Sequence, residues 1–418
     1  MLHAIFIIFL FALGACVGSF LNVVVWRLPR DESLVSPPSH CPKCNTNLSW
    51  RDNIPVFGWF LLGGKCRYCR EPISLRYPIV ESVTGAMFVL YYVLYFIAQK
   101  GLCPPVQPLI ARALDMRLDW PIYAIHMYLL ATLLAASLID AELFIIPVEM
   151  TWWAAAVGLV VHALVDRPTV PGALVIPAPA GAMAAGGAVG LIVSLVLLKR
   201  KIIPTSFAEL APLMEHERER HLVEATRARA EGREPPPEQP DMTPAQIRAE
   251  VRKEIVFLLP PLLLAIAAVV LYASVGPLRS AWDQVMRANL ISVSGLLGAT
   301  LGALVGALVV WATRILGTLA FGREAMGMGD VHLMFGVGAV VGAGPSILAF
   351  FVAPFFGILV AVYMLLTGTR RELPYGPYLS LGTAFAMVWY CDIANGRIGD
   401  GVRGIGLLLR DFFTRTGT

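Results

Sequence analysis

The sequence predicts an all-α protein that crosses a membrane many times. Hydrophobic residues make up 57% of the 418 positions and charged residues only 15%, whereas soluble domains carry about 25% charged residues. Long apolar runs recur along the chain, and about 20 apolar residues are enough to span a bilayer as a helix. We therefore expect about ten transmembrane helices of that length. They are placed near residues 4–26, 78–98, 121–139, 148–165, 175–198, 255–275, 288–317, 331–343, 346–367 and 378–393.

Lys and Arg cluster in three of the loops between these apolar segments. The loops are residues 27–77, the polar stretch 199–254, and a short connection that contains Arg370 and Arg371. All three fall on one side if the segments alternate strictly, and an excess of basic residues marks the cytoplasmic side. We expect these loops in the cytoplasm and both termini outside. No basic residue precedes the first apolar run, so we interpret it as a membrane helix rather than a cleaved signal peptide.

The chain divides into successive regions along its length. The charged stretch carries both signs of charge and is broken by three consecutive prolines, which favours a solvated, partly helical insertion over a partner-docking segment. The expected regions are a first transmembrane helix (1–26), a cytoplasmic loop (27–77), transmembrane helices (78–165), an extra transmembrane region (166–198), the charged cytoplasmic insertion (199–254), further transmembrane helices (255–393) and a C-terminal tail (394–418).

The loop 27–77 contains two CxxC pairs. Each pair allows two thiolates to converge on one ion, and four thiolates form the closed tetrahedral zinc site of structural zinc proteins. Such a site has no open position for a substrate, so we expect zinc to stabilise the fold of a small loop domain. Two independent redox pairs are the alternative. The predicted zinc ligands are Cys41, Cys44, Cys66 and Cys69.

Two aspartates lie at the ends of apolar segments. Asp140 ends the third segment, and Asp330 follows Gly327 and Gly329 at the junction of the seventh and eighth. The alternation places both at the cytoplasmic membrane face. An ionisable residue near the membrane interior is costly and marks a candidate functional site. For either aspartate alone, a helix cap or an interfacial side chain is the competing interpretation.

A pair of carboxylates on one face suits peptide hydrolysis. Two neighbouring carboxylates do not both ionise easily, so they titrate separately and share a proton. The ionised member then deprotonates a water molecule while the protonated member donates to the scissile carbonyl. The glycines beside Asp330 permit unusual backbone angles and close approach of a substrate strand or helix.

Six motifs, in this order, resemble those of the type IV prepilin peptidases. The resemblance covers residues 1–165 and 295–393. The motifs are Gly18–Pro29, the two CxxC pairs, Arg76–Glu81, Asp140 with Ile146-Pro147, Met326–Asp330, and Pro374-Tyr375-Gly376-Pro377.

This resemblance implies an aspartyl endopeptidase of the bacterial inner membrane that serves type IV pili or type II secretion. The enzyme removes the basic leader of prepilins and pseudopilins by cutting after a glycine at the cytoplasmic face. The resemblance also implies N-methylation of the new N-terminus from S-adenosylmethionine. It assigns catalysis to Asp140 and Asp330, with supporting roles for Gly327, Gly329, Pro374, Gly376 and Pro377.

The sequence departs from the family at several positions. His332 stands where the family usually has lysine, and residues 166–290 have no recognised counterpart. That region adds two spans and the charged insertion to a family-like core, and an even number of spans preserves the alternation. Glu81 lies at a helix start, where an acid is favoured by the helix dipole; a role in methyl transfer is the alternative.

Two other functions compete with the prepilin peptidase interpretation. An intramembrane protease of the presenilin or signal-peptide-peptidase type also carries a GxGD motif, but the thiolate loop and the Pro374–Pro377 motif argue against it. A membrane scaffold or transporter with a zinc loop and no catalysis is the second, because buried carboxylates also serve proton-coupled transport. No basic helix or basic–aromatic patch indicates nucleic-acid binding. The expected partners are prepilin-like substrates and membrane lipid, and the sequence predicts no oligomeric state.

Overall fold

The computed structural model describes residues 2–104, 113–207, 243–287, 292–367 and 373–396. Three predicted features lie wholly or mostly outside these residues. They are most of the charged insertion (208–242), the Arg370-Arg371 pair, and most of the C-terminal tail (397–418).

The regular secondary structure of the described residues is helical, with two isolated β-bridges in the cysteine-rich loop and no strand. The prediction of an all-α fold is confirmed. In chain order the elements are α1 (Leu2–Arg27), η1 (Leu28–Arg30), α2 (Phe57–Leu61), α3 (Arg76–Tyr92), η2 (Val93–Ile97), α4 (Met116–Leu143), α5 (Val148–Val165), α6 (Ala178–Lys199), α8 (Pro244–Ser274), α9 (Gly276–Met286), α10 (Val293–Phe321), α11 (Met328–Val341), α12 (Ala343–Thr367) and α13 (Gly376–Asn395).

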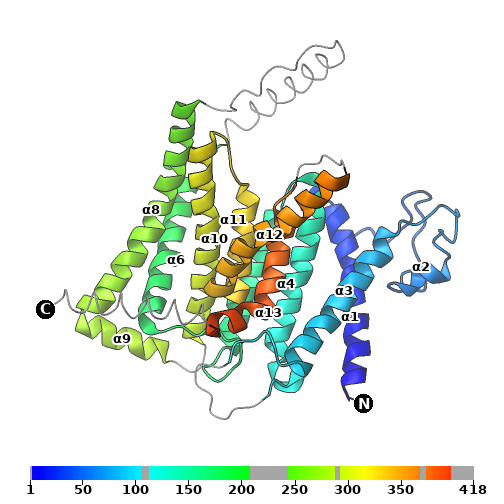
Figure 1. Cartoon of the computed structure of the whole chain (residues 1–418), viewed down its shortest axis with the longest axis horizontal. Helices are drawn as coiled ribbons and strands as arrows, with labels where there is room; N and C mark the ends of the chain where they lie inside the picture. The colour runs from blue at the N-terminus through cyan, green and yellow to red at the C-terminus, as the bar shows by residue number, and fades with distance from the viewer. Residues whose placement is uncertain (1, 105–112, 208–242, 288–291, 368–372, 397–418) are drawn as a thin grey trace.

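Each of the expected apolar segments forms a helix. Among the described residues, eight helices are long and apolar enough to cross a membrane. The protein is therefore a multi-pass membrane protein. The two remaining expected segments form α11, which is shorter, and α13. Apart from α9, which lies across the lower end of the bundle, the long helices alternate in direction in Figure 1, so the α10–α11 junction and the start of α13 lie at the same end of the bundle.

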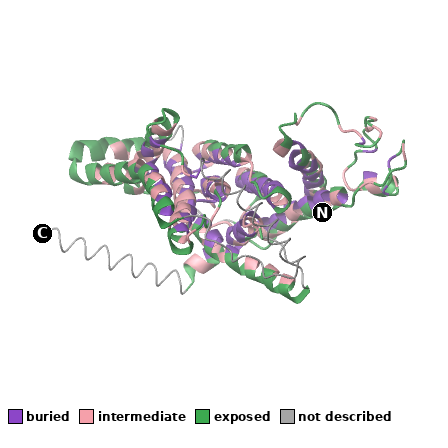
Figure 2. Cartoon of the chain, turned by 90° about the horizontal axis from the view of Figure 1, so that it is seen from above, coloured by how far each residue is buried: buried purple, intermediate pink, exposed green. Residues whose placement is uncertain are grey.

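Helix α4 lies at the centre of the bundle and α8 at its edge. In the most apolar stretch of α4, 72% of the residues are buried, against 6% in that of α8. The central cluster combines residues of α4 with residues of α3, α11, α12 and α13. Seen from above, buried residues face the middle of the bundle and exposed residues line its outside (Figure 2). Exposed apolar side chains are the expected outer surface of a protein whose solvent is lipid.

Small residues let α10 and α11 approach each other closely. A Cβ added to Gly302 of α10 would lie 2.1 Å from the carbonyl oxygen of Gly338 in α11. The reverse substitution at Gly338 would place a Cβ 2.0 Å from the oxygen of Gly302. One turn further along α10, a Cβ on Gly306 would lie 2.3 Å from the oxygen of Met334. This small-residue packing fixes α11, and with it Asp330, against α10.

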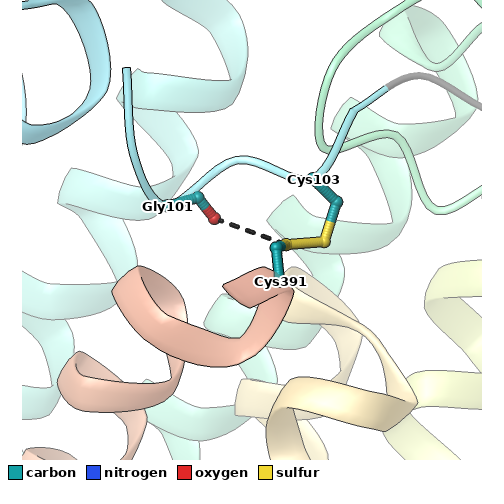
Figure 3. Close-up of a disulfide and its surroundings, with 3 residues drawn as sticks. All are labelled: Gly101, Cys103 and Cys391. Carbon is teal, nitrogen blue, oxygen red and sulfur yellow. Dashed lines mark hydrogen bonds between the residues drawn. A yellow bond between two sulfur atoms is a disulfide. The ribbon is translucent and has the colours of Figure 1, made fainter. Parts of the chain in front are cut away.

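A disulfide ties the α3–α4 connection to the last helix. Cys103 and Cys391 have their Cα atoms 5.4 Å apart, and Figure 3 shows the bond between the loop and the end of α13. The Sγ of Cys391 also lies 3.8 Å from the carbonyl oxygen of Gly101. The bridge therefore holds the end of α13 that is opposite to Gly376.

Candidate active site and metal centre

Asp140 lies in the last turn of α4. The helix ends because Phe144 adopts a left-handed conformation with φ 56°, and its N–H donates to the carbonyl oxygen of Asp140 at 2.9 Å. The Asp140 side chain is buried, with 7% of its surface exposed. Its Oδ2 accepts a hydrogen bond from the backbone N–H of Gly376 at 3.0 Å.

Gly376 can make this bond because it is the first residue of α13. The first N–H groups of a helix have no partner within the helix, so that of Gly376 is available for Asp140. Pro377 follows in the first turn, where the missing N–H of proline has no cost. Pro374 precedes the helix by two residues. A Cβ on Gly376 would lie 2.6 Å from Asp140 Oδ2, so the contact requires glycine.

Asp330 lies in the first turn of α11 and is also 7% exposed. Gly327 is the residue that precedes the helix, with extended backbone angles of φ −69° and ψ 149°. A Cβ on Gly329 would lie 3.1 Å from the Cβ of Ile146, which belongs to the α4–α5 connection. The glycine therefore lets α11 approach that connection.

Ile146 lies between Gly376, which bonds Asp140, and Gly329, which precedes Asp330. Its Cδ1 would lie 3.1 Å from a Cβ on Gly376, and its Cβ faces Gly329. Asp140 is bonded to Gly376 and Asp330 directly follows Gly329, so each aspartate lies beside a glycine that packs against Ile146. The structure thus brings Asp140, Asp330, Gly329 and Gly376 into one buried site at the meeting point of three helix ends.

Two further positions singled out in the sequence lie elsewhere. His332 packs beside Trp152 of α5, with ring centroids 6.3 Å apart, and its Nδ1 is buried without a hydrogen-bond partner among the described residues. Glu81 is buried in α3, and its Oε2 accepts the backbone N–H of Val56 at 2.6 Å. Glu81 therefore anchors the cysteine-rich loop to the membrane bundle.

The four predicted zinc ligands converge. Their Sγ atoms all lie within 4.8 Å of one another, and those of Cys41 and Cys69 are 3.8 Å apart. A zinc ion with Zn–S bonds of about 2.3 Å in a tetrahedron has sulfurs about 3.8 Å apart. The cluster can therefore hold zinc, as the spacing predicts.

The two CxxC segments of the thiol cluster have the same local backbone structure. In the first, the N–H of Asn45 donates to Cys41 O at 2.8 Å, and Asn45 has φ 54°. In the second, the N–H of Arg70 donates to Cys66 O at 3.0 Å, and Arg70 has φ 62°. Each CxxC pair thus ends in a left-handed residue that turns the chain back and points both thiols inward.

An ion pair supports the loop beside this cluster. Arg67 donates to Asp52 Oδ1 through Nε at 2.9 Å and through Nη2 at 2.5 Å. The Arg67 guanidinium holds the pKa of the Asp52 carboxyl below its usual range. Arg67 is therefore paired with Asp52 within the loop.

Sequence reasoning missed Arg314 and the disulfide partners. Arg314 lies inside the apolar helix α10 and is 2% exposed. A single cation in an apolar run was a usable signal, because such residues pair with one another or mark function. Cys103 and Cys391 were the two cysteines outside the CxxC pairs that the alternation assigns to the outer side.

Comparison with known proteins gives two family matches. The family model described as "Bacterial Peptidase A24 N-terminal domain" matches residues 12–95, and the "Type IV leader peptidase family" model matches residues 255–362. The second match contains Asp330, whereas Asp140 lies between the two matches. No solved structure matches the chain.

Curated relatives agree with these matches. The chain is 55% identical over 84 residues to a prepilin leader peptidase/N-methyltransferase of Myxococcus xanthus, which is 20% of this chain and 25% of the relative. It is 49% identical over 88 residues to a protein of the same name from Klebsiella pneumoniae, covering 20% of this chain and 39% of the relative. Similarity thus spans well under half of each relative. Residues 12–95 and 255–362 of this chain are thus similar to the type IV prepilin peptidases.

Proposed function

We propose that this protein is a membrane aspartyl endopeptidase that cleaves the basic leader from type IV prepilins or pseudopilins after a glycine. One observation carries the proposal. Two buried aspartates from separate helices, Asp140 and Asp330, lie at the same end of the bundle, each beside a glycine that packs against Ile146. Paired carboxylates beside a glycine that contacts one of them are the arrangement that acid–base hydrolysis of a peptide needs.

The proposed reaction uses one carboxylate as base and the other as acid. The ionised aspartate takes a proton from water, and the water oxygen bonds to the scissile carbonyl carbon. The protonated aspartate gives its proton to the carbonyl oxygen. When the tetrahedral intermediate collapses, the C–N bond breaks, the leaving amine takes up the proton held by the base, and one hydroxyl of the intermediate returns a proton to the other aspartate, which restores the starting pair. The N–H of Gly376 keeps Asp140 oriented through both steps.

We place the active site on the cytoplasmic side of the inner membrane. Asp140, the start of α11 and the start of α13 share one end of the bundle. The thiol cluster lies in the loop that follows α1, and the alternation of the helices assigns the end of α1 to the same side. The disulfide joins Cys103 and Cys391 at the opposite end. Thiols persist in the reducing cytoplasm and disulfides in the oxidising periplasm, so the two kinds of cysteine support this orientation.

The thiol cluster has a structural role in this proposal. Residues 27–77 form a zinc loop domain held to α3 by Glu81, and residues 199–254 form a charged cytoplasmic insertion between two membrane segments. When bound, zinc would link the two CxxC hairpins and stabilise a loop that has little apolar core. Neither Asp140 nor Asp330 is a zinc ligand in this proposal.

A second activity, N-methylation of the new N-terminus from S-adenosylmethionine, is favoured by the names of the relatives. We assign it no residues. Incubating the cleaved substrate with the enzyme and methyl-labelled donor tests it directly. Label on the new N-terminus supports the activity, and its absence during complete cleavage contradicts it.

The test of the peptidase is cleavage of a model prepilin by purified protein in detergent. The substrate has a basic leader that ends in glycine, and mass spectrometry locates the cut. We expect one cut after that glycine, and loss of the cut when the glycine is replaced by a bulky residue. An intact substrate after incubation with folded, zinc-loaded protein contradicts the proposal.

A further inference from the structure

Arg314 is a buried cation next to the loop that leads to Asp330. It lies two turns before the end of α10, inside an otherwise apolar helix, and its side chain is 2% exposed. A buried guanidinium is costly unless its donors are bonded and its charge is compensated. The groups that bond Arg314 therefore indicate the structural role of this buried cation.

Two of these partners belong to the α10–α11 connection. The Nη1 of Arg314 donates to Glu324 Oε1 at 2.5 Å and also to the carbonyl oxygen of Met326. Met326 directly precedes Gly327, the residue before α11, and Asp330 follows in the first turn. The guanidinium thus holds the backbone where it enters the helix that carries Asp330.

Other contacts also hold this connection. At its beginning, Gly322 closes α10 with φ 74°, and the N–H of Ala325 donates to Thr318 Oγ1 at 3.2 Å. The carbonyl of Met326 is bonded by Arg314. The half of the connection nearest to Asp330 is therefore held by this hydrogen bond from Arg314 and by the packing of the Met326 side chain against the central hydrophobic cluster.

The compensating charge comes from α8. Glu254 is 2% exposed, and its Oε1 accepts from Arg314 Nε at 2.9 Å. Its Oε2 accepts from Trp311 Nε1 at 3.1 Å. Both oxygens are thus bound by α10, and no other ion pair of α8 in the described part of the chain reaches the core of the site.

We propose that Arg314 is a positioning residue for Asp330 and that Glu254 of α8 holds Arg314 in place. The expectation that residues 166–290 have no family counterpart is wrong for residues 255–290, which the family match includes. The α6–α8 pair, of which only residues 255–274 fall within that match, is then coupled to the active site through one buried ion pair. The inference rests on the proposed function for its effect on catalysis. Its structural half, order in residues 322–330, is measurable without any substrate.

The test combines three variants with one control. Glu254→Gln keeps the shape of the side chain but removes its charge. Arg314→Lys keeps the charge but loses the branched guanidinium, whose separate N–H groups bond Glu254 and the loop at the same time. Trp311→Phe is milder, because it removes only one hydrogen bond to Glu254. Lys253→Gln is the control, because Lys253 lies next to Glu254 on α8 but pairs with Glu250 and, among the described residues, makes no hydrogen bond or ion pair with the loop.

Two readouts are taken in detergent on protein that retains zinc. The first is amide hydrogen exchange of residues 322–330, and the second is kcat and KM for the model prepilin. We expect Glu254→Gln and Arg314→Lys to speed exchange there and to lower kcat by roughly tenfold or more, because small displacements of a catalytic group have large effects on rate. KM stays within about twofold, Trp311→Phe shifts both readouts less, and Lys253→Gln matches the wild type.

The outcomes separate the two proposals. Unchanged exchange in residues 322–330 for both Glu254→Gln and Arg314→Lys overturns the positioning role, whatever the kinetics. Faster exchange with unchanged kcat overturns the coupling to catalysis. Faster exchange together with a wild type that cleaves nothing supports the positioning role and contradicts the proposed peptidase.

Discussion

The backbone N–H of Gly376 donates to Asp140 Oδ2 at 3.0 Å, between residues 236 positions apart in sequence. The bond joins the end of α4 to the start of α13 and fixes one carboxylate of the proposed pair. It forms only because residue 376 has no side chain, since a Cβ there would lie 2.6 Å from the same oxygen.

Replacing Gly376 by alanine is expected to lower cleavage strongly. The added methyl group displaces the Asp140 carboxylate or the start of α13, and we expect kcat to fall by about a hundredfold. Gly357→Ala is the matched control, because the nearest atom to a Cβ at position 357 is 3.5 Å away, an ordinary contact. Equal activity of the two variants would show that the Gly376 contact does not matter.

Loss of one zinc ligand is expected to unfold the cysteine-rich loop while leaving the bundle intact. Cys41→Ser removes one of four converging thiols, and structural zinc sites supply much of the folding free energy of such small domains. We expect zinc content to fall and proteolysis within residues 27–77 to rise. Cys16→Ser is the control, since Cys16 is exposed on α1. Wild-type protein that is folded but contains no zinc contradicts the assignment.

The proposed membrane orientation predicts different reactivities for the disulfide cysteines and the CxxC cysteines. A thiol reagent that does not cross membranes is applied to intact spheroplasts. Cys103 and Cys391 are expected to react only after reduction, because they form a disulfide on the outer side. The CxxC cysteines are expected to react only after permeabilisation and removal of zinc. Labelling of the CxxC cysteines in intact, untreated spheroplasts would reverse the orientation.

Glu81→Gln is expected to loosen the attachment of the loop to α3. The chain makes a tight three-residue turn in which Phe57 N–H donates to Pro55 O at 2.7 Å, and Val56 has φ 62° and ψ −57°. This backbone conformation is strained for a β-branched residue, and the carboxylate of Glu81 stabilises it by accepting the Val56 N–H. A neutral amide is a weaker acceptor by about 1 kcal/mol.

Hydrogen exchange at the Val56 amide measures this effect. Faster exchange in Glu81→Gln supports the anchoring role. Unchanged exchange together with loss of methyl transfer would instead assign Glu81 to the second activity.

The sequence predicted the helices and the thiol cluster because both depend on local patterns. Apolar runs of helix length indicate spans whatever packs against them, and the CxxC spacing fixes its own hairpins.

What the sequence could not predict are contacts between distant segments. The Gly376–Asp140 bond, the Cys103–Cys391 disulfide and the Arg314–Glu254 pair join positions 236, 288 and 60 residues apart. No periodicity connects such positions, because their contact depends on how whole helices are arranged. The family resemblance named Asp140 and Gly376 separately, but only the packing of α4 against α13 explains why the motif needs glycine.

The central claim is that Asp140 and Asp330 act together in peptide cleavage. Asp140→Asn and Asp330→Asn are compared with wild type in the detergent assay, with zinc content as the check on folding. Asp283→Asn is the control, because Asp283 lies on α9 and bonds Tyr272. The account predicts that each active-site variant loses cleavage by about a hundredfold or more while the control cleaves normally. Full cleavage by either folded active-site variant would contradict it.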